Sequence, residues 1–156
     1  MLLVILYLFI LTTVSSVKFI EQKECLVAGD GDGIIYVYSY DTDEKVTSIE
    51  AHEGNIRSLV VHPTDPLVLS SSDDHLIKIW DWEKGWECIR TLEGHSDTVM
   101  QVVFNPVDTD SFASASLDQT IKVPFDLGLS SHQGESHLTI YYPSLLRSCN
   151  LNTKNF

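Results

Sequence analysis

The stretch EAHEGNIRSLVVHPTDPLVLSSSDDHLIKIWDW, residues 50–82, decides the fold, because its pattern returns further along the chain. The second copy is EGHSDTVMQVVFNPVDTDSFASASLDQTIKV, residues 93–123. Matching positions lie 43 or 44 residues apart: His52 and His95, Pro63 and Pro106, Ser70 and Ser114, Asp74 and Asp118. An earlier half-copy, residues 26–52, aligns Asp32 with Asp74. This spacing predicts a row of similar structural units.

Each copy reads as a set of short β-strands without sustained helical periodicity. The clearest β-rich runs, separated by turn-forming residues, are 56–61, 67–71, 76–82 and 86–92. A period of about 40–45 residues with Gly94-His95 and Trp80-Asp81 is typical of the WD repeat, in which four strands make one propeller blade. We therefore expect an all-β chain, a partial WD-repeat β-propeller of about two and a half blades.

The ends of the chain differ from the repeats, so three segments are expected: 1–16, 17–123 and 124–156. Residues 1–11 are wholly apolar, which suits a secretory signal or membrane anchor, but no basic residue precedes Lys18. The alternative is a segment foreign to the domain. Pro124 stands where the repeat predicts a tryptophan, and because proline has no N–H, the strand should end there. Beyond it, we expect an irregular tail.

Charge and cysteine content exclude several classes of function. Ten basic residues face 22 acidic ones, a net charge of −12, which disfavours nucleic acid and favours basic partners. Cys25, Cys88 and Cys149 are far apart and form no CxxC motif, so we expect neither a disulfide framework, nor a metal site, nor a cofactor. The DGDG run at 30–33 resembles the start of a calcium loop, but later ligand positions do not fit, and a tight turn is the better interpretation.

One repeat carries a complete set of polar signature residues. His52, Ser70, Asp74 and Trp80 match the hydrogen-bonded tetrad of WD repeats, and His95, Ser114 and Asp118 form a partial set. A buried histidine and aspartate are tolerated only when each finds a partner. The alternative, a Ser/His/Asp hydrolase, is disfavoured because a nucleophile needs an exposed oxyanion site. We expect a structural role, no catalytic residues and no enzyme.

The residues between the signatures are more specific. WDWEKGW and VMQVVFNP, with VYSYDTDEKV and FASASLDQTIKV, closely resemble the coatomer beta-prime subunit family over about residues 17–123. The resemblance implies blades two to four of that family's first propeller, with blade two incomplete. It also implies a structural and cargo-recognition role in the COPI coat, in Golgi-to-ER and intra-Golgi transport. The alternative is a WD-repeat scaffold of another protein complex.

The resemblance further implies partners and a binding site. The family's first propeller binds dilysine tails of cargo through acidic residues on its upper face. Asp73 matches one of these acids, whereas Gly54 stands at the other and Glu53 is its neighbour. We therefore expect Asp73 and Glu53 to bind a basic tail. Other coatomer subunits are expected as partners. The expected location is cytoplasmic, on Golgi membranes and COPI vesicles, with membrane association indirect through the coat.

Overall fold

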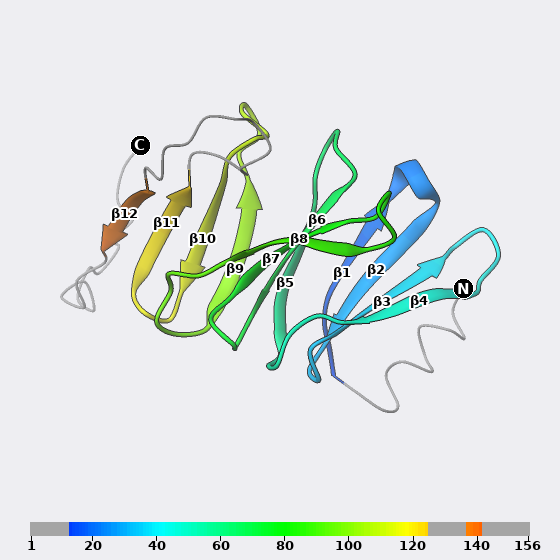
Figure 1. Cartoon of the computed structure of the whole chain (residues 1–156), viewed down its shortest axis with the longest axis horizontal. Helices are drawn as coiled ribbons and strands as arrows, with labels where there is room; N and C mark the ends of the chain where they lie inside the picture. Colours follow the sequence, from blue (N-terminus) through cyan, green and yellow to red (C-terminus); the bar gives the residue numbers. More distant parts are fainter. Residues whose placement is uncertain (1–12, 125–136, 142–156) are drawn as a thin grey trace, which may run out of the picture.

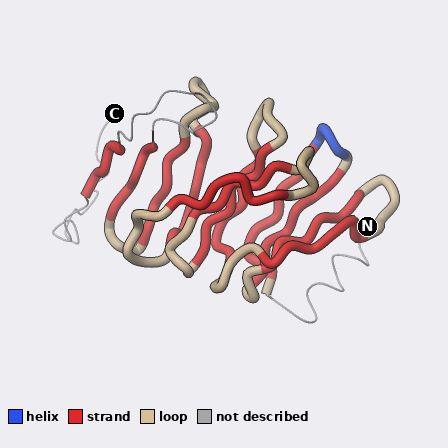
Figure 2. Tube along the Cα trace, viewed as in Figure 1, coloured by secondary structure: helices blue, strands red, loops and turns tan. Residues whose placement is uncertain are grey.

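Three antiparallel sheets stand in a row, with the middle sheet between the other two (Figure 1). The computed structural model describes residues 13–124 and 137–141. Within these ranges, twelve strands and one short 3-10 helix, η1 at Glu21–Lys23, make up the regular structure (Figure 2). The predicted all-β class and partial propeller are confirmed.

Each sheet has four strands that follow one another in chain order. The first sheet contains β1 (Val14–Ile20), β2 (Cys25–Asp30), β3 (Ile34–Ser39) and β4 (Lys45–Glu50). The second contains β5 (Ile56–Val61), β6 (Leu67–Ser72), β7 (Ile77–Asp81) and β8 (Glu87–Leu92). The third contains β9 (Val99–Phe104), β10 (Phe112–Ser116), β11 (Thr120–Pro124) and β12 (His137–Tyr141).

The four strands predicted in the central repeat match β5 to β8, with ends that differ by at most one residue. The number of blades differs, because the structure has three four-stranded sheets instead of about two and a half. The first sheet is complete because β1 begins at Val14, inside the predicted N-terminal segment 1–16. Its strand carries none of the signature residues, so the repeat pattern did not extend to it.

The third sheet is completed by β12, which consists of residues 137–141 of the segment that the sequence predicts to be an irregular tail. β11 includes Pro124, which pairs with His137, and β12 pairs along β11 in antiparallel register. The sequence HLTIY of β12 is rich in β-branched and aromatic residues, which favour a strand when an open sheet edge is available. Residues 1–12, which contain the apolar run 1–11 of the suggested signal or anchor, and Cys149 lie outside the described residues.

Matching irregularities show that the first sheet is the same unit as the second. The β1–β2 register shifts between Val14 and Ser16, and the β5–β6 register shifts between Ile56 and Ser58, 42 residues later. The β2–β3 connection is the tight turn predicted for DGDG, with Asp30 Oδ1 accepting the N–H of Asp32 and Gly33 at φ +81°. The positive φ explains the glycine, since a side chain strains this conformation.

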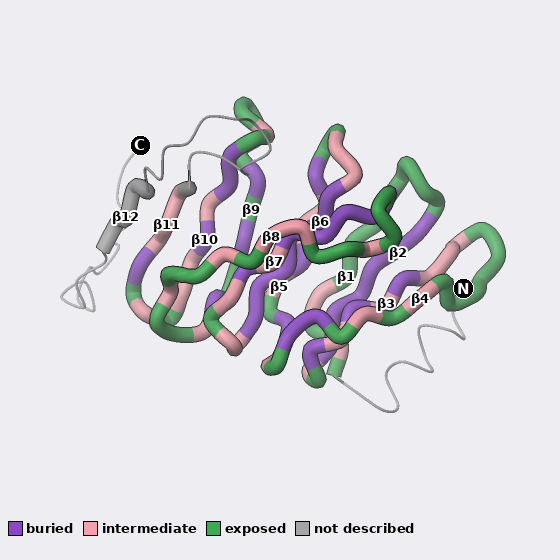
Figure 3. Tube along the Cα trace, viewed as in Figure 1, coloured by how far each residue is buried: buried purple, intermediate pink, exposed green. Residues whose placement is uncertain are grey.

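Two apolar cores separate the three sheets. The first lies between sheets one and two and includes Val27, Val37, Leu59 and Trp80, and the second lies between sheets two and three and includes Leu69, Ile79 and Val102. Every residue of β6 is buried, because its sheet is covered on both faces (Figure 3). Full burial of one such aliphatic side chain contributes about 1.5–3 kcal/mol. Within the two described ranges, no helix has the length and apolar character needed to traverse a bilayer.

Candidate functional site

The four signature residues of the second sheet form one hydrogen-bonded chain. Trp80 Nε1 donates to Ser70 Oγ over 2.8 Å, and Ser70 Oγ lies 2.7 Å from His52 Nε2. His52 Nδ1 lies 2.8 Å from Asp74 Oδ2. Since a carboxylate only accepts, His52 carries its proton on Nδ1, and Nε2 accepts the Ser70 hydroxyl proton. The chain joins the loop before β5, the strands β6 and β7, and the turn between them.

Burial sets the protonation state of the histidine. The His52 side chain is fully buried, and this desolvation lowers its pKa, although the Asp74 carboxylate partly opposes the shift. His52 is therefore neutral near pH 7, as its acceptor role at Nε2 requires. Asp74 also accepts the N–H of Glu53 through Oδ2 and that of Leu76 through Oδ1, so the carboxylate fixes both the loop and the turn.

The same distances resemble a Ser/His/Asp triad, but the nucleophile has no access to a substrate. Ser70 has an exposed fraction of 0% and its oxygen already accepts the indole N–H of Trp80. An acyl-transfer serine must reach a carbonyl carbon beside an oxyanion site. The arrangement therefore supports a structural role for the three polar residues.

The third sheet repeats the arrangement without a tryptophan. His95 Nδ1 lies 2.7 Å from Asp118 Oδ2, and His95 Nε2 lies 2.8 Å from Ser114 Oγ. In the second sheet, Trp80 donates to the serine oxygen. In the third sheet, Ser114 Oγ lies instead 3.4 Å from the Lys122 carbonyl oxygen. Burial alone would raise the pKa of Asp118, but hydrogen bonds from Thr120, His95 and backbone N–H groups hold it well below its usual range.

The first sheet lacks the polar network, because residues 42 positions earlier differ in type. Ala28 stands at the position of Ser70, and Tyr38 stands at that of Trp80. Asp32 aligns with Asp74, yet the turn is held by Asp30, whose Oδ1 accepts the N–H groups of Asp32 and Ile34. The fold of this sheet thus rests on its apolar core and register instead of the tetrad.

The two proposed cargo-binding acids lie on adjacent loops at the same end of the second sheet. The loops are tied by the Asp73 N–H, which donates to the Asn55 carbonyl oxygen over 3.0 Å. Glu53 is exposed. Asp73 is already bound: Arg57 Nε and Nη2 donate to its two carboxylate oxygens, each over 2.6 Å, and Asn55 Nδ2 donates to Oδ2 over 3.0 Å. The Arg57 hydrogen bond lowers the pKa of Asp73, so the carboxylate is charged at neutral pH.

Several polar contacts were not predicted from the sequence. Lys78 Nζ donates to the Ala51 carbonyl oxygen over 2.6 Å, and Lys122 Nζ donates to that of Gly94 over 2.5 Å. The two lysines lie 44 residues apart and could have been found from the repeat alignment. The contact of Arg57 could not be found from the alignment, because Met100 stands at the matching position of the next repeat.

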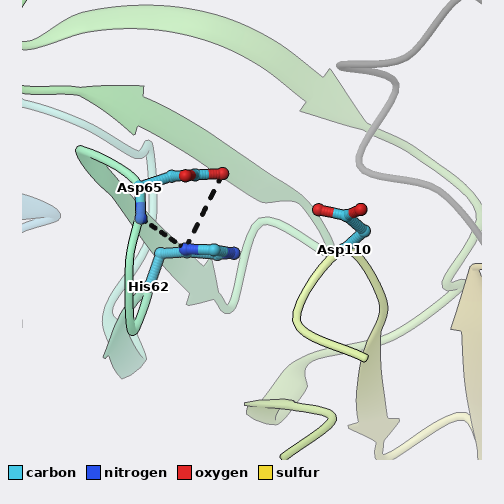
Figure 4. Close-up of side chains that lie close together, drawn as sticks. All are labelled: His62, Asp65 and Asp110. Carbon is cyan, nitrogen blue, oxygen red and sulfur yellow. Dashed lines mark hydrogen bonds and ion pairs between the residues drawn. The ribbon is translucent and has the colours of Figure 1, made fainter. Parts of the chain in front are cut away.

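His62, Asp65 and Asp110 gather between the second and third sheets (Figure 4). Their potential metal-binding atoms lie within 4.8 Å of one another. However, His62 Nε2 donates to the Thr109 carbonyl oxygen over 3.0 Å, and Nδ1 accepts the Asp65 N–H over 2.8 Å. Both ring nitrogens are therefore hydrogen-bonded to backbone groups. The buried His62 links the two sheets instead of offering a ligand atom to a metal.

A family model described as "WD domain, G-beta repeat" matches residues 43–81 and 86–123. These segments include the tetrad of the second sheet and the partial set of the third. These two segments of the chain are WD40 repeats. The first sheet has the same strand order and register shifts and extends the row of blades toward Val14.

Coatomer beta-prime subunits are similar to part of this chain. It is 54% identical over 70 residues to coatomer subunit beta'-2 of Arabidopsis thaliana, covering 40% of this chain and 8% of the relative. It is 70% identical over 44 residues to beta'-1 of the same plant, covering 28% and 5%. Coatomer subunit beta' of Rattus norvegicus is 60% identical over 52 residues, covering 33% and 6%. The chain thus matches a small part of the length of these relatives.

Proposed function

We propose that this chain acts as a protein-binding part of the COPI vesicle coat, in the place of a coatomer beta-prime subunit. The observation that carries the proposal is the 54–70% identity to coatomer beta-prime subunits. The role is structural and cargo-recognising, in Golgi-to-ER and intra-Golgi transport. Other coatomer subunits are its partners, and the coat supplies its contact with Golgi membranes from the cytoplasmic side.

The polar chemistry of the site favours binding over catalysis. Ser70 is buried, whereas Glu53 is exposed and Asp73 is partly exposed at one end of the second sheet. A net charge of −12 attracts basic partners and repels nucleic acid. We place a lysine-rich cargo tail at this end, where Asp73 binds one ammonium group and Glu53 binds a second.

A lysine of the cargo tail must compete with Arg57 for Asp73, because Arg57 already binds that carboxylate. An exposed ion pair contributes only about 0.2–1 kcal/mol, so the exchange is close to neutral. Two such pairs contribute at most about 2 kcal/mol, which supports a dissociation constant of about tens of millimolar or weaker. The site therefore suits weak recognition strengthened by many copies within a coat.

The proposal is tested by capture of the tagged full-length chain from cells, with the tag alone as control. Mass spectrometry should find other coatomer subunits enriched with the chain. Enrichment of a different complex without coatomer would replace the proposal with the alternative, a WD-repeat scaffold of that complex. Enrichment of neither would contradict a coat role.

A further inference from the structure

The turns β6–β7 and β10–β11 are tied in the same way to the loops that precede β5 and β9. The Asp73 N–H donates to the Asn55 carbonyl oxygen over 3.0 Å. The Leu117 N–H donates to the Thr98 carbonyl oxygen over 2.9 Å. The two donors lie 44 residues apart in the sequence, and the two acceptors lie 43 residues apart. Leu117 therefore occupies in sheet three the place that Asp73 occupies in sheet two.

The first strand of each of these sheets adds a bulged residue at the same end. The β5–β6 register skips Arg57, and the β9–β10 register skips Met100, 43 residues later. Arg57 reaches Asp73 from this position, with Nε and Nη2 each 2.6 Å from a carboxylate oxygen. The matching backbone brings Met100 and Leu117 to neighbouring positions. Sheet three thus carries an apolar pair, Met100 and Leu117, where sheet two carries a charged one.

The apolar pair is open to solvent at the end of its sheet. Met100 is 41% exposed and Leu117 is 57% exposed. This exposure does not depend on what packs beyond sheet three. In sheet two, the side chains of Arg57 and Asp73 remain 38% and 24% exposed although sheet three packs against that sheet. A neighbouring blade therefore leaves these two positions accessible.

The apolar pair adjoins the acidic loops. Hydrogen bonds from Arg57 and, with a smaller effect, from Thr98 lower the pKa of Asp73, so the loop that leads into β9 touches this carboxylate. On the other side of Asp73, sheet one has Ser15 and Gly31 at the matching positions, and neither offers a large apolar side chain. An apolar group that binds next to Asp73 therefore lies on the side of sheet three.

We infer that the basic tail proposed for Asp73 also carries an apolar side chain, which packs on Met100 and Leu117. The inference rests on the proposed function, because the lysine at Asp73 holds the peptide in place. Packed sheets lie about 10 Å apart, and an extended peptide advances about 3.3 Å per residue. In a tail that ends in two lysines, the apolar residue then stands about three positions before the first of them. The site selects tails by this residue as well as by charge.

The apolar contact adds a contribution to binding that salt does not remove. Salt screens the attraction between exposed charges, whereas the burial of apolar surface from water persists. Raising the salt concentration should therefore weaken the binding of every lysine-tailed peptide. The ratio of affinities between a peptide with the apolar residue and one without it should stay the same.

Four peptides, titrated against the full-length chain by NMR, test the inference. Each ends in two lysines or two serines, and each carries leucine or serine three positions before that pair. The leucine–lysine peptide should bind about fivefold more tightly than the serine–lysine peptide, because part of the leucine surface is buried. Met100→Gln and Leu117→Asn should each reduce this ratio toward one. Val107→Asn is the matched control and should preserve it, since Val107 is 93% exposed in the β9–β10 loop at the other end of the sheet.

The outcomes separate this inference from the proposed function. If the serine–lysine peptide binds better than the serine–serine peptide but leucine adds nothing, the inference is overturned and the basic-tail site stands. If the leucine ratio survives both Met100→Gln and Leu117→Asn, the leucine binds elsewhere and the inference is equally overturned. If the leucine–serine peptide binds as tightly as the leucine–lysine peptide, the lysine at Asp73 is contradicted together with the inference that rests on it.

Discussion

His52 Nε2 lies 2.7 Å from Ser70 Oγ and thereby joins the loop before β5 to the buried middle of β6. The contact spans 18 residues of sequence and places a polar pair beside the first apolar core. It is tolerated there because Asp74 and Trp80 satisfy the remaining polar atoms of the two side chains. The network therefore contributes to the rigidity of the blade end that carries Glu53 and Asp73.

Replacing Trp80 with phenylalanine should destabilise the chain by about 1–3 kcal/mol, because the Ser70 hydroxyl loses a buried donor. Equilibrium urea unfolding measures the change. Trp86→Phe is the control, since Trp86 packs at the edge of the same core and lies outside the network. Equal stability of Trp80→Phe and the wild-type chain would contradict the network.

Acidification should destabilise the chain through His52, whose pKa burial lowers in the folded state. Because the unfolded histidine titrates near pH 6.5, the unfolded chain binds more protons below that pH. The stabilising contribution of neutral His52 is thus present above about pH 6.5 and is lost as the pH falls toward the lowered value. Unfolding free energies of wild type and His52→Gln should be compared from pH 7.5 to 5.5, with a steeper loss expected in the wild type. Parallel curves would exclude His52 as the cause.

The serine of the tetrad should not react as a hydrolase nucleophile. A fluorophosphonate probe needs direct access to the oxygen, and Ser70 is 0% exposed. Incubation of the folded chain with the probe, followed by peptide mass spectrometry, should leave Ser70 unmodified. Labelling that disappears in His52→Gln would instead support an activated serine and an enzymatic role.

Much of the central sheet followed from the sequence because its local signals agree. Turn residues, β-branched runs and the Trp80-Asp81 signature all point to the same four strands, and the bounds of β5 to β8 match the prediction closely. The number of strands in the two outer sheets was underestimated for a physical reason. β1 and β12 are held as strands by pairing with β2 and β11, which is tertiary information that no local pattern contains.

The sequence predicted those residues of the site that belong to the repeat pattern. The repeat alignment indicated that His52, Ser70, Asp74 and Trp80 lie close together. Arg57 was missed because it lies 16 residues from Asp73 and does not recur in the next repeat. Side-chain pairs across two loops depend on the register of β5 and β6, so they could not be deduced from composition or motif spacing.

The competition at Asp73 gives a prediction about affinity. Arg57→Gln should free the carboxylate and strengthen the binding of a peptide that ends in two lysines by up to about fivefold, equivalent to about 1 kcal/mol. Arg90→Gln removes the same charge from β8 and controls for the general change in net charge. Equal effects of the two substitutions would show that only the overall charge matters.

The most direct test of a protein-binding role at these acidic loops is a titration at low salt with the dilysine peptide and a control peptide carrying two serines. NMR should show weak binding of the dilysine peptide alone, with a dissociation constant of about tens of millimolar or weaker. Asp73→Asn and Glu53→Gln should each reduce the difference between the two peptides. Equal binding of both peptides to the wild-type chain, or undiminished binding by Asp73→Asn, would contradict the role.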